Sequence, residues 1–162
     1  MDSMDFGGIC AFTAVDTFTR EADILLAPEL TAKCGARFLF QSMRRRFGGH
    51  VHLIQTDGGP GFKADFLTNA PLFCHRHRVA RPYRKNEQSY FESFNRTVRK
   101  GFLGWQKNPV SDLKECTDMV ESFLQRYHYH RPHLGLGMRP SLMPNNSKEA
   151  DCRIFTENRA TH

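Results

Sequence analysis

The chain has 162 residues, of which 40% are hydrophobic and 25% charged, which is enough for one domain with a packed core. It has no long apolar run and no signal-peptide pattern, which argues against a membrane span and against secretion. The formal net charge is +6, and residues 76–100 alone hold eight Arg or Lys against two acids. A basic segment of this density favours a polyanion as partner.

The beginning of the chain predicts two paired strands and then a third. The apolar run "ICAFTAV" at 9–15 is rich in strand formers, and "MDF" precedes it across Gly7-Gly8. Two short runs around a Gly-Gly pair are typical of a β-hairpin. A third strand is expected at 20–26.

A helix and a buried strand follow. Thr31 can cap a helix. Its apolar positions follow helical spacing and are Ala36, Leu39, Phe40, Met43 and Phe47. Gly48-Gly49 is expected to end this helix. The run "HVHLIQT" then predicts a buried strand that stops at Asp57, before the loop "GGPG".

The rest of the chain alternates between helices and one more strand. Residues 62–74 are expected to be helical, and "HRVARPY" predicts a short strand that Pro82 ends. Helices are expected at 87–104, with Asn86 as its cap, and at about 112–128. A hairpin followed by helical crossovers indicates a mixed α/β sheet covered by helices.

Five cysteines are scattered along the chain, and no CxxC pair occurs. An odd, scattered set indicates reduced thiols in a cytosolic protein rather than a disulfide framework. His75 and His77, and the group His128, His130 and His133, have spacings that match no usual zinc site.

Asp57 is the first candidate for chemistry. It stands where a predicted strand ends and a glycine-rich loop begins, which is where open α/β sheets place their sites. Glycines there let a bulky ligand approach the backbone closely. A turn-forming role explains an Asp before Gly-Gly equally well.

Glu92 is the second candidate. On a helix, Glu92, Asn95, Arg96 and Arg99 lie at i, i+3, i+4 and i+7 and therefore share one face. One interpretation is a surface Glu–Arg pair worth only a few tenths of a kcal/mol, roughly. The other is a carboxylate that binds a metal while flanking donors hold a phosphate backbone beside it.

A pair of carboxylates that share a site repel each other unless a cation lies between them. Hard oxygen ligands in an incomplete protein shell suit Mg²⁺, which also takes phosphate oxygens. Two such ions about 3.5–4 Å apart can assist both the nucleophile and the leaving oxygen in phosphoryl transfer.

Three segments, in this order, resemble the catalytic core of bacterial insertion-sequence transposases and retroviral integrases, the DDE superfamily. They are "LIQTDGGPGF" (53–62), "RPYRKNEQSYFESFNRTVRK" (81–100) and "YHYHRPHLGLGMRP" (127–140). Asp57 and Glu92 are 35 positions apart, close to the family's spacing between its second Asp and its Glu. The closing pattern of the bacterial members matches at Tyr127, Arg131, Pro132, His133, Leu136 and Pro140.

The family also needs an Asp on its first strand. Asp16 stands at the end of the second strand, usually a structural position, and is close to Asp57 in sequence. Asp2 and Asp5 lie on opposite faces of the first strand, so at most one of them can serve. Counting back from "AVDTFTR" favours Asp2, with Asp5 and Asp16 as the alternatives.

The resemblance covers residues 1–140 and implies an RNase H-like fold, with a five-stranded mixed sheet in the order 3-2-1-4-5 flanked by helices. The family's upstream helix-turn-helix region is not in the sequence, so an N-terminally truncated core is expected, with residues 141–162 as a polar, flexible tail. Gly61, Ser89 and His128 depart from frequent family residues. Gly61 is expected to weaken DNA contact.

The implied function is metal-dependent DNA strand cleavage and strand transfer. Asp2, Asp57 and Glu92 would be the catalytic residues and the ligands of two Mg²⁺ or Mn²⁺ ions. The expected DNA-binding residues are Arg84, Lys85, Gln88, Asn95, Arg96, Arg99 and Lys100. The expected partners are element ends and target DNA, with a homo-oligomer acting in the bacterial cytoplasm.

Two other functions stay open on the sequence. A truncated first strand is compatible with a catalytically impaired remnant that binds DNA or associates with itself. A nuclease for RNA–DNA hybrids shares the fold, although the "YHYHRPH" ending argues against it.

Overall fold

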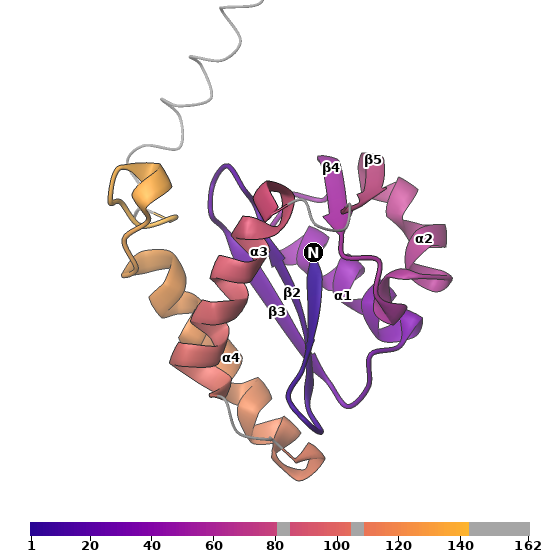
Figure 1. The fold of residues 1–162 in the computed structure, drawn as a ribbon, viewed down its shortest axis with the longest axis horizontal. Helices are drawn as coiled ribbons and strands as arrows, with labels where there is room; N and C mark the ends of the chain where they lie inside the picture. The colour runs from indigo at the N-terminus through magenta and orange to yellow at the C-terminus, as the bar shows by residue number, and fades with distance from the viewer. Residues whose placement is uncertain (81–84, 105–108, 143–162) are drawn as a thin grey trace, which may run out of the picture.

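The computed structural model describes residues 1–80, 85–104 and 109–142, and the side chains of residues 85–90 lie outside this description. The strands are β1 (Asp2–Asp5), β2 (Cys10–Val15), β3 (Ala22–Ala27), β4 (Val51–Thr56) and β5 (Cys74–Val79). The helices are α1 (Ala32–Arg45), α2 (Asp65–Asn69), α3 (Lys85–Val98) and α4 (Leu113–Tyr129) (Figure 1).

The strands form two groups. β1, β2 and β3 are antiparallel in the order β1-β2-β3, and β4 pairs with β5 in parallel. Between the groups, the Met1 amine donates a 2.6 Å hydrogen bond to the Gln55 carbonyl. The mixed α/β character is therefore as predicted. The order 3-2-1-4-5 as one continuous sheet is not confirmed, because β1 and β4 share this contact and no strand ladder.

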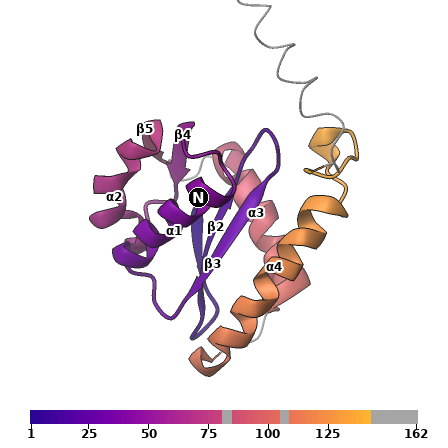
Figure 2. The same cartoon turned by 180° about the vertical axis from the view of Figure 1, so that it is seen from behind.

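The apolar core lies in two clusters, one on each face of the antiparallel sheet. Strand residues alternate between faces, so Ala11 and Ile24 pack against α3 and α4, while Phe12 and Leu25 pack on the α1 side. Figures 1 and 2 show α3 and α4 side by side over one face of this sheet and α1 over the other. The fold is thus a sheet between two helical layers.

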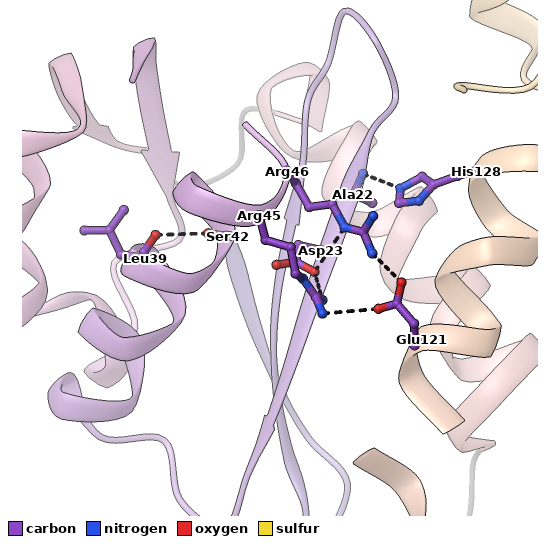
Figure 3. Close-up of polar contacts among 8 residues, drawn as sticks. All are labelled: Ala22, Asp23, Leu39, Ser42, Arg45, Arg46, Glu121 and His128. Atoms are coloured by element: carbon purple, nitrogen blue, oxygen red, sulfur yellow. Dashed lines mark hydrogen bonds and ion pairs between the residues drawn. The ribbon is translucent and has the colours of Figure 1, made fainter. Parts of the chain in front are cut away.

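An ionic cluster joins three of these elements (Figure 3). Asp23 of β3 is fully buried and accepts a hydrogen bond from the Arg45 guanidinium at the end of α1. Arg45 and the neighbouring Arg46 also bind Glu121 of α4, at 3.2 and 2.9 Å. The cluster therefore ties α1, β3 and α4 together at one point.

His128 makes a second link between β3 and α4. It is buried, and its Nε2 accepts a 3.0 Å hydrogen bond from the backbone N–H of Ala22. Burial, with the nearby Arg46 cation, lowers the pKa of His128 to about 4, so the ring is neutral and free to accept. The departure from the family pattern at this position thus has a structural role in this chain.

Several element boundaries differ from the sequence predictions. The helix expected at 62–74 is divided into short pieces, since Ala64 has a positive φ of 38°. β5 accordingly begins at Cys74. α3 begins at Lys85, which places Asn86 inside the helix rather than at its cap, and the chain continues as a π-helical turn over Arg99–Leu103.

The closing motif mostly builds the core. Tyr127 is buried and packs edge-on against the Phe94 and His133 rings, and burial raises its pKa to about 12. Beyond α4, Leu142 donates its backbone N–H to the His128 carbonyl. Residues 143–162, most of the predicted tail, lie outside the described residues.

The four cysteines in the described part of the chain, Cys10, Cys34, Cys74 and Cys116, are free thiols. Cys152 lies outside it. Among the described helices, none has the length and apolar character that crossing a bilayer requires.

Candidate active site

The start of β1 and the end of β4 bring two acids together. Asp2 is the first residue of β1, and Asp57 directly follows Thr56, the last residue of β4. Their carboxyl groups lie within hydrogen-bonding reach of each other. Two carboxylates at this separation form the pair that the sequence predicted for a divalent cation.

The electrostatics of the pair follow from this proximity. Desolvation of the carboxyl group raises the pKa of Asp57 to about 6; a hydrogen bond from the Gly59 N–H opposes the shift, and the Asp2 carboxylate adds to it. Partial desolvation and the neighbouring negative charge both favour the neutral form of this carboxyl group. A cation between the two groups would remove that repulsion.

Asp2 is held by protein donors on both carboxylate oxygens. Its Oδ1 accepts the backbone N–H of Ser3 at 2.9 Å, and its Oδ2 accepts the Asn95 side-chain amide of α3 at 2.5 Å. The Asn95 carbonyl oxygen in turn accepts the Thr13 hydroxyl at 2.9 Å. Asn95 was predicted to contact DNA, but the structure places its side chain on Asp2.

Glu92, the third predicted acid, stands on α3, the helix whose Asn95 binds Asp2. It is exposed on α3, three residues before Asn95, so it stands one helical turn from the residue that binds Asp2. Throughout the described residues, no three His, Cys, Asp or Glu side chains converge closely enough to hold a metal ion. The structure therefore assembles two of the three predicted acids and places the third nearby.

The two alternative first acids occupy turns instead. Asp5 accepts the backbone N–H of Gly7 at 2.6 Å in the β1–β2 turn. Asp16 accepts the backbone N–H of Phe18 at 2.7 Å in the β2–β3 turn. The acid whose charge raises the pKa of Asp57 is Asp2.

The loop after Asp57 depends on its glycines. A Cβ on Gly59 would lie 3.1 Å from the Asp57 carboxylate, and Gly58 has a positive φ of 77°. Gly61 is buried, and a Cβ there would lie only 2.3 Å from the Phe12 ring. The expectation that Gly61 loses a DNA contact is therefore not supported, because no side chain fits at this position as the core is packed.

The predicted basic residues fall into three groups. Arg96 and Lys100 are exposed, while Arg99 is half-buried with its guanidinium 4.5 Å from the centre of the Phe6 ring. Lys85 and Gln88 belong to α3, but their side chains lie outside the described residues, as does the whole of Arg84. The predicted contacts that are exposed cations in the described residues are thus Arg96 of α3 and Lys100 of the π-helical turn that follows it.

A cavity of about 520 Å³ lies between the end of β2, the strand β4 and the end of α1. Its wall includes Met1, Gln55 and Phe91, which are chain neighbours of the three acids, and it is mostly apolar. Such a lining does not suit a phosphate or a cation, so we place the candidate site at the acids and not in this cavity.

The donor set fits a hard divalent cation. Asp2 and Asp57 offer carboxylate oxygens, and each keeps lone pairs beyond those used by Ser3, Asn95 and Gly59. Oxygen donors in an incomplete shell are typical of Mg²⁺ and Mn²⁺ sites.

Sequence reasoning did not identify Ser3 and Thr13, which complete the surroundings of Asp2. One signal for Thr13 was available. It is the single polar residue within "CAFTAV", and a polar side chain in a buried strand needs a hydrogen-bond partner.

Comparisons with known proteins agree with this architecture. Residues 74–140 match the family model of the integrase core domain. No curated protein gives a significant match.

Two solved structures share the fold. The catalytic core domain of BIV integrase matches with a TM-score of 0.65 and 18% identity, over 87% of this chain and 88% of that one. The simian T-cell lymphotropic virus intasome, in complex with PP2A regulatory subunit B56 gamma, matches with a TM-score of 0.63 and 15% identity. That match covers 86% of this chain and 52% of the other. Residues 74–140 are thus similar to the integrase core domain, and the chain shares the RNase H-like fold of retroviral integrase catalytic cores.

Proposed function

We propose that the chain performs metal-dependent cleavage and strand transfer of DNA. The observation that carries the proposal is the Asp2–Asp57 pair, joined from two strands at the edge where α3 presents Glu92. Two carboxylates this close repel each other, and a bound cation would relieve that repulsion.

In this proposal the three acids hold the metal ions, and the ions act on the DNA phosphate. Asp2 and Asp57 would hold two Mg²⁺ or Mn²⁺ ions, and Glu92 would complete their ligands from α3. When bound, the ions supply charge neutralisation and polarisation at the reacting phosphate. Water would attack a phosphodiester at an element end, and the freed 3′-hydroxyl would then attack target DNA.

The DNA would lie along α3. Arg96 of α3 and Lys100 of the turn after it are exposed and would neutralise backbone phosphates, with Arg84, Lys85, Gln88, Asn95 and Arg99 as further contacts. Contacts to phosphates position DNA without reading its sequence. We further propose that the working form is a homo-oligomer acting in the cytoplasm on element ends and target DNA.

One observation favours a second function. Glu92 makes no contact with the acid pair, and no group of three ligands converges among the described residues. A chain that keeps this arrangement with DNA bound would be a DNA-binding or self-associating remnant without catalysis.

Plasmid nicking tests the two proposals. Purified protein is incubated with supercoiled DNA in Mn²⁺, in Mg²⁺ and in EDTA. We expect metal-dependent nicking that Asp2→Asn, Asp57→Asn and Glu92→Gln each reduce by at least about 100-fold, because each removes a charge needed at the phosphate. Asp5→Asn is the matched control, since Asp5 serves a turn at the other end of the same strand.

Each outcome selects one function. DNA retention without nicking in any metal would support the remnant. Undiminished nicking by Glu92→Gln would show that Glu92 is not a catalytic residue. Preference for an RNA–DNA hybrid over duplex DNA would point to a hybrid nuclease instead.

A further inference from the structure

Thr13 is a polar side chain at the centre of an apolar strand. It is 1% exposed and stands directly opposite Asp2 in the β1–β2 register. Valine has nearly the same shape and would fill this place without burying a hydroxyl. The hydroxyl is satisfied by Asn95, whose Oδ1 it reaches at 2.9 Å. The buried polar group therefore serves a contact between the sheet and α3.

The hydrogen bonds give Asn95 one orientation. The Thr13 hydroxyl donates to the Asn95 carbonyl oxygen, which leaves the NH₂ group facing the Asp2 carboxylate. The reverse orientation would set the Asn95 oxygen against a carboxylate oxygen, and two acceptors repel. The Asp2 carboxylate, which can only accept, thus selects this orientation, and the Thr13 hydroxyl satisfies the Asn95 oxygen that the orientation presents.

The same contacts leave Asp2 able to bind a ligand. Ser3 and Asn95 use one lone pair on each carboxylate oxygen, and a carboxylate offers about four acceptor sites in all. Asn95 also lies one turn from Glu92 on α3, so its bond to Asp2 fixes that turn of the helix relative to β1.

We propose that Thr13 and Asn95 are positioning residues, which orient the Asp2 carboxylate and hold the Glu92 turn of α3 over the acid pair. This inference rests on the proposed function for the cation and on the Thr13–Asn95–Asp2 hydrogen bonds for the geometry. Groups that orient a metal ligand typically change metal affinity by 10–100-fold, roughly, when they are removed.

The first test needs no metal. The side-chain amide signal of Asn95 is followed by ¹⁵N NMR in wild type, Thr13→Val and Asp2→Asn. We expect a large shift and faster hydrogen exchange in both variants, because each removes one partner of that amide. A signal that neither variant moves would overturn the arrangement.

The second test measures Mn²⁺ affinity by calorimetry. Thr13→Val and Asn95→Leu are expected to weaken binding by about 10-fold or more, and Thr13→Ser, which keeps the hydroxyl, to restore it. Thr97→Val is the matched control, since the Thr97 hydroxyl bonds the Ser93 carbonyl within α3. Thermal unfolding of each variant confirms that it is folded.

The outcomes distinguish the positioning role from the proposed function. Unchanged Mn²⁺ affinity in folded Thr13→Val and Asn95→Leu would overturn the positioning role and leave the proposed function standing. Wild-type protein that binds no Mn²⁺ would overturn both.

Discussion

Gly35 and Gly61 meet backbone to backbone where α1 passes the loop that follows Asp57. A Cβ on Gly35 would lie 1.7 Å from the Gly61 carbonyl oxygen, and a Cβ on Gly61 would lie 2.3 Å from Phe12. Both glycines are therefore needed for close approach. Their packing sets the path of the loop that carries Asp57.

Gly61→Ala is expected to destabilise the fold by about 1–3 kcal/mol, because the added methyl group must displace the buried Phe12 ring. Urea unfolding followed by circular dichroism measures the loss. Gly101→Ala is the control, since its Cβ would meet Phe123 at an ordinary 3.4 Å. Equal stability of wild type and Gly61→Ala would show that the loop can shift without cost.

β3 and α4 are joined by two polar links, and each gives a measurable prediction. The first is the bond from the Ala22 N–H to the neutral His128 ring. The second is the ionic cluster of Asp23, the two arginines and Glu121. They act on the same helix through different chemistry.

Stability should fall as the pH drops from about 6.5 to about 4, the window between the ordinary pKa of histidine and that of buried His128. In this window the unfolded chain binds a proton that the folded chain does not, so acid favours unfolding. His128→Gln keeps an acceptor for Ala22 and should flatten the dependence. Thermal unfolding of wild type and His128→Gln across this pH range tests the prediction. His130→Gln, at an exposed histidine, is the control. An equal dependence of stability on pH in all three proteins would contradict it.

The two acids of the ionic cluster should contribute unequally to the stability of the fold. Asp23→Ala is expected to cost roughly 3 kcal/mol, because it leaves the largely buried Arg46 without its nearest buried acid. Glu121→Gln should cost less than about 1 kcal/mol, since Glu121 is half-exposed. Denaturant unfolding compares them, and equal losses would mean that the cluster acts as a surface network.

Charge on the whole molecule is uneven. The net charge is +6, and the exposed cations Arg96 and Lys100 lie on α3 and on the turn that follows it. Helix α3 is on the far side of the antiparallel sheet from α1 (Figures 1 and 2). A helix that carries cations beside an acid pair can bring phosphates to the acids while long-range attraction concentrates DNA at that face.

DNA affinity should therefore fall steeply with salt. Arg96→Gln and Lys100→Gln are each expected to reduce the slope of log K against log salt by about 1, because each removes one phosphate contact. Fluorescence anisotropy with a duplex at several salt concentrations measures it. Arg44→Gln on α1 removes the same charge from the opposite face, and an equal effect there would indicate binding by net charge alone.

The sequence by itself predicted the local features well. Thr31 caps α1 by accepting the Cys34 N–H, Gly7 takes a positive φ in the first turn, and Asp57 follows the end of a strand. Such features depend on a few neighbouring residues, so they can be read from short patterns. The placing of Glu92 and Asn95 on one helical face belongs to the same class.

Tertiary structure decided the rest. Whether Asp2, Asp5 or Asp16 would meet Asp57 depended on the β1–β2 register and on the contact between β1 and β4, which no local pattern encodes. The bond from Asn95 to Asp2 likewise depends on Thr13, which is far away in sequence and binds the Asn95 carbonyl oxygen. Side chains pair by distance in space, and packing of the whole chain sets that distance.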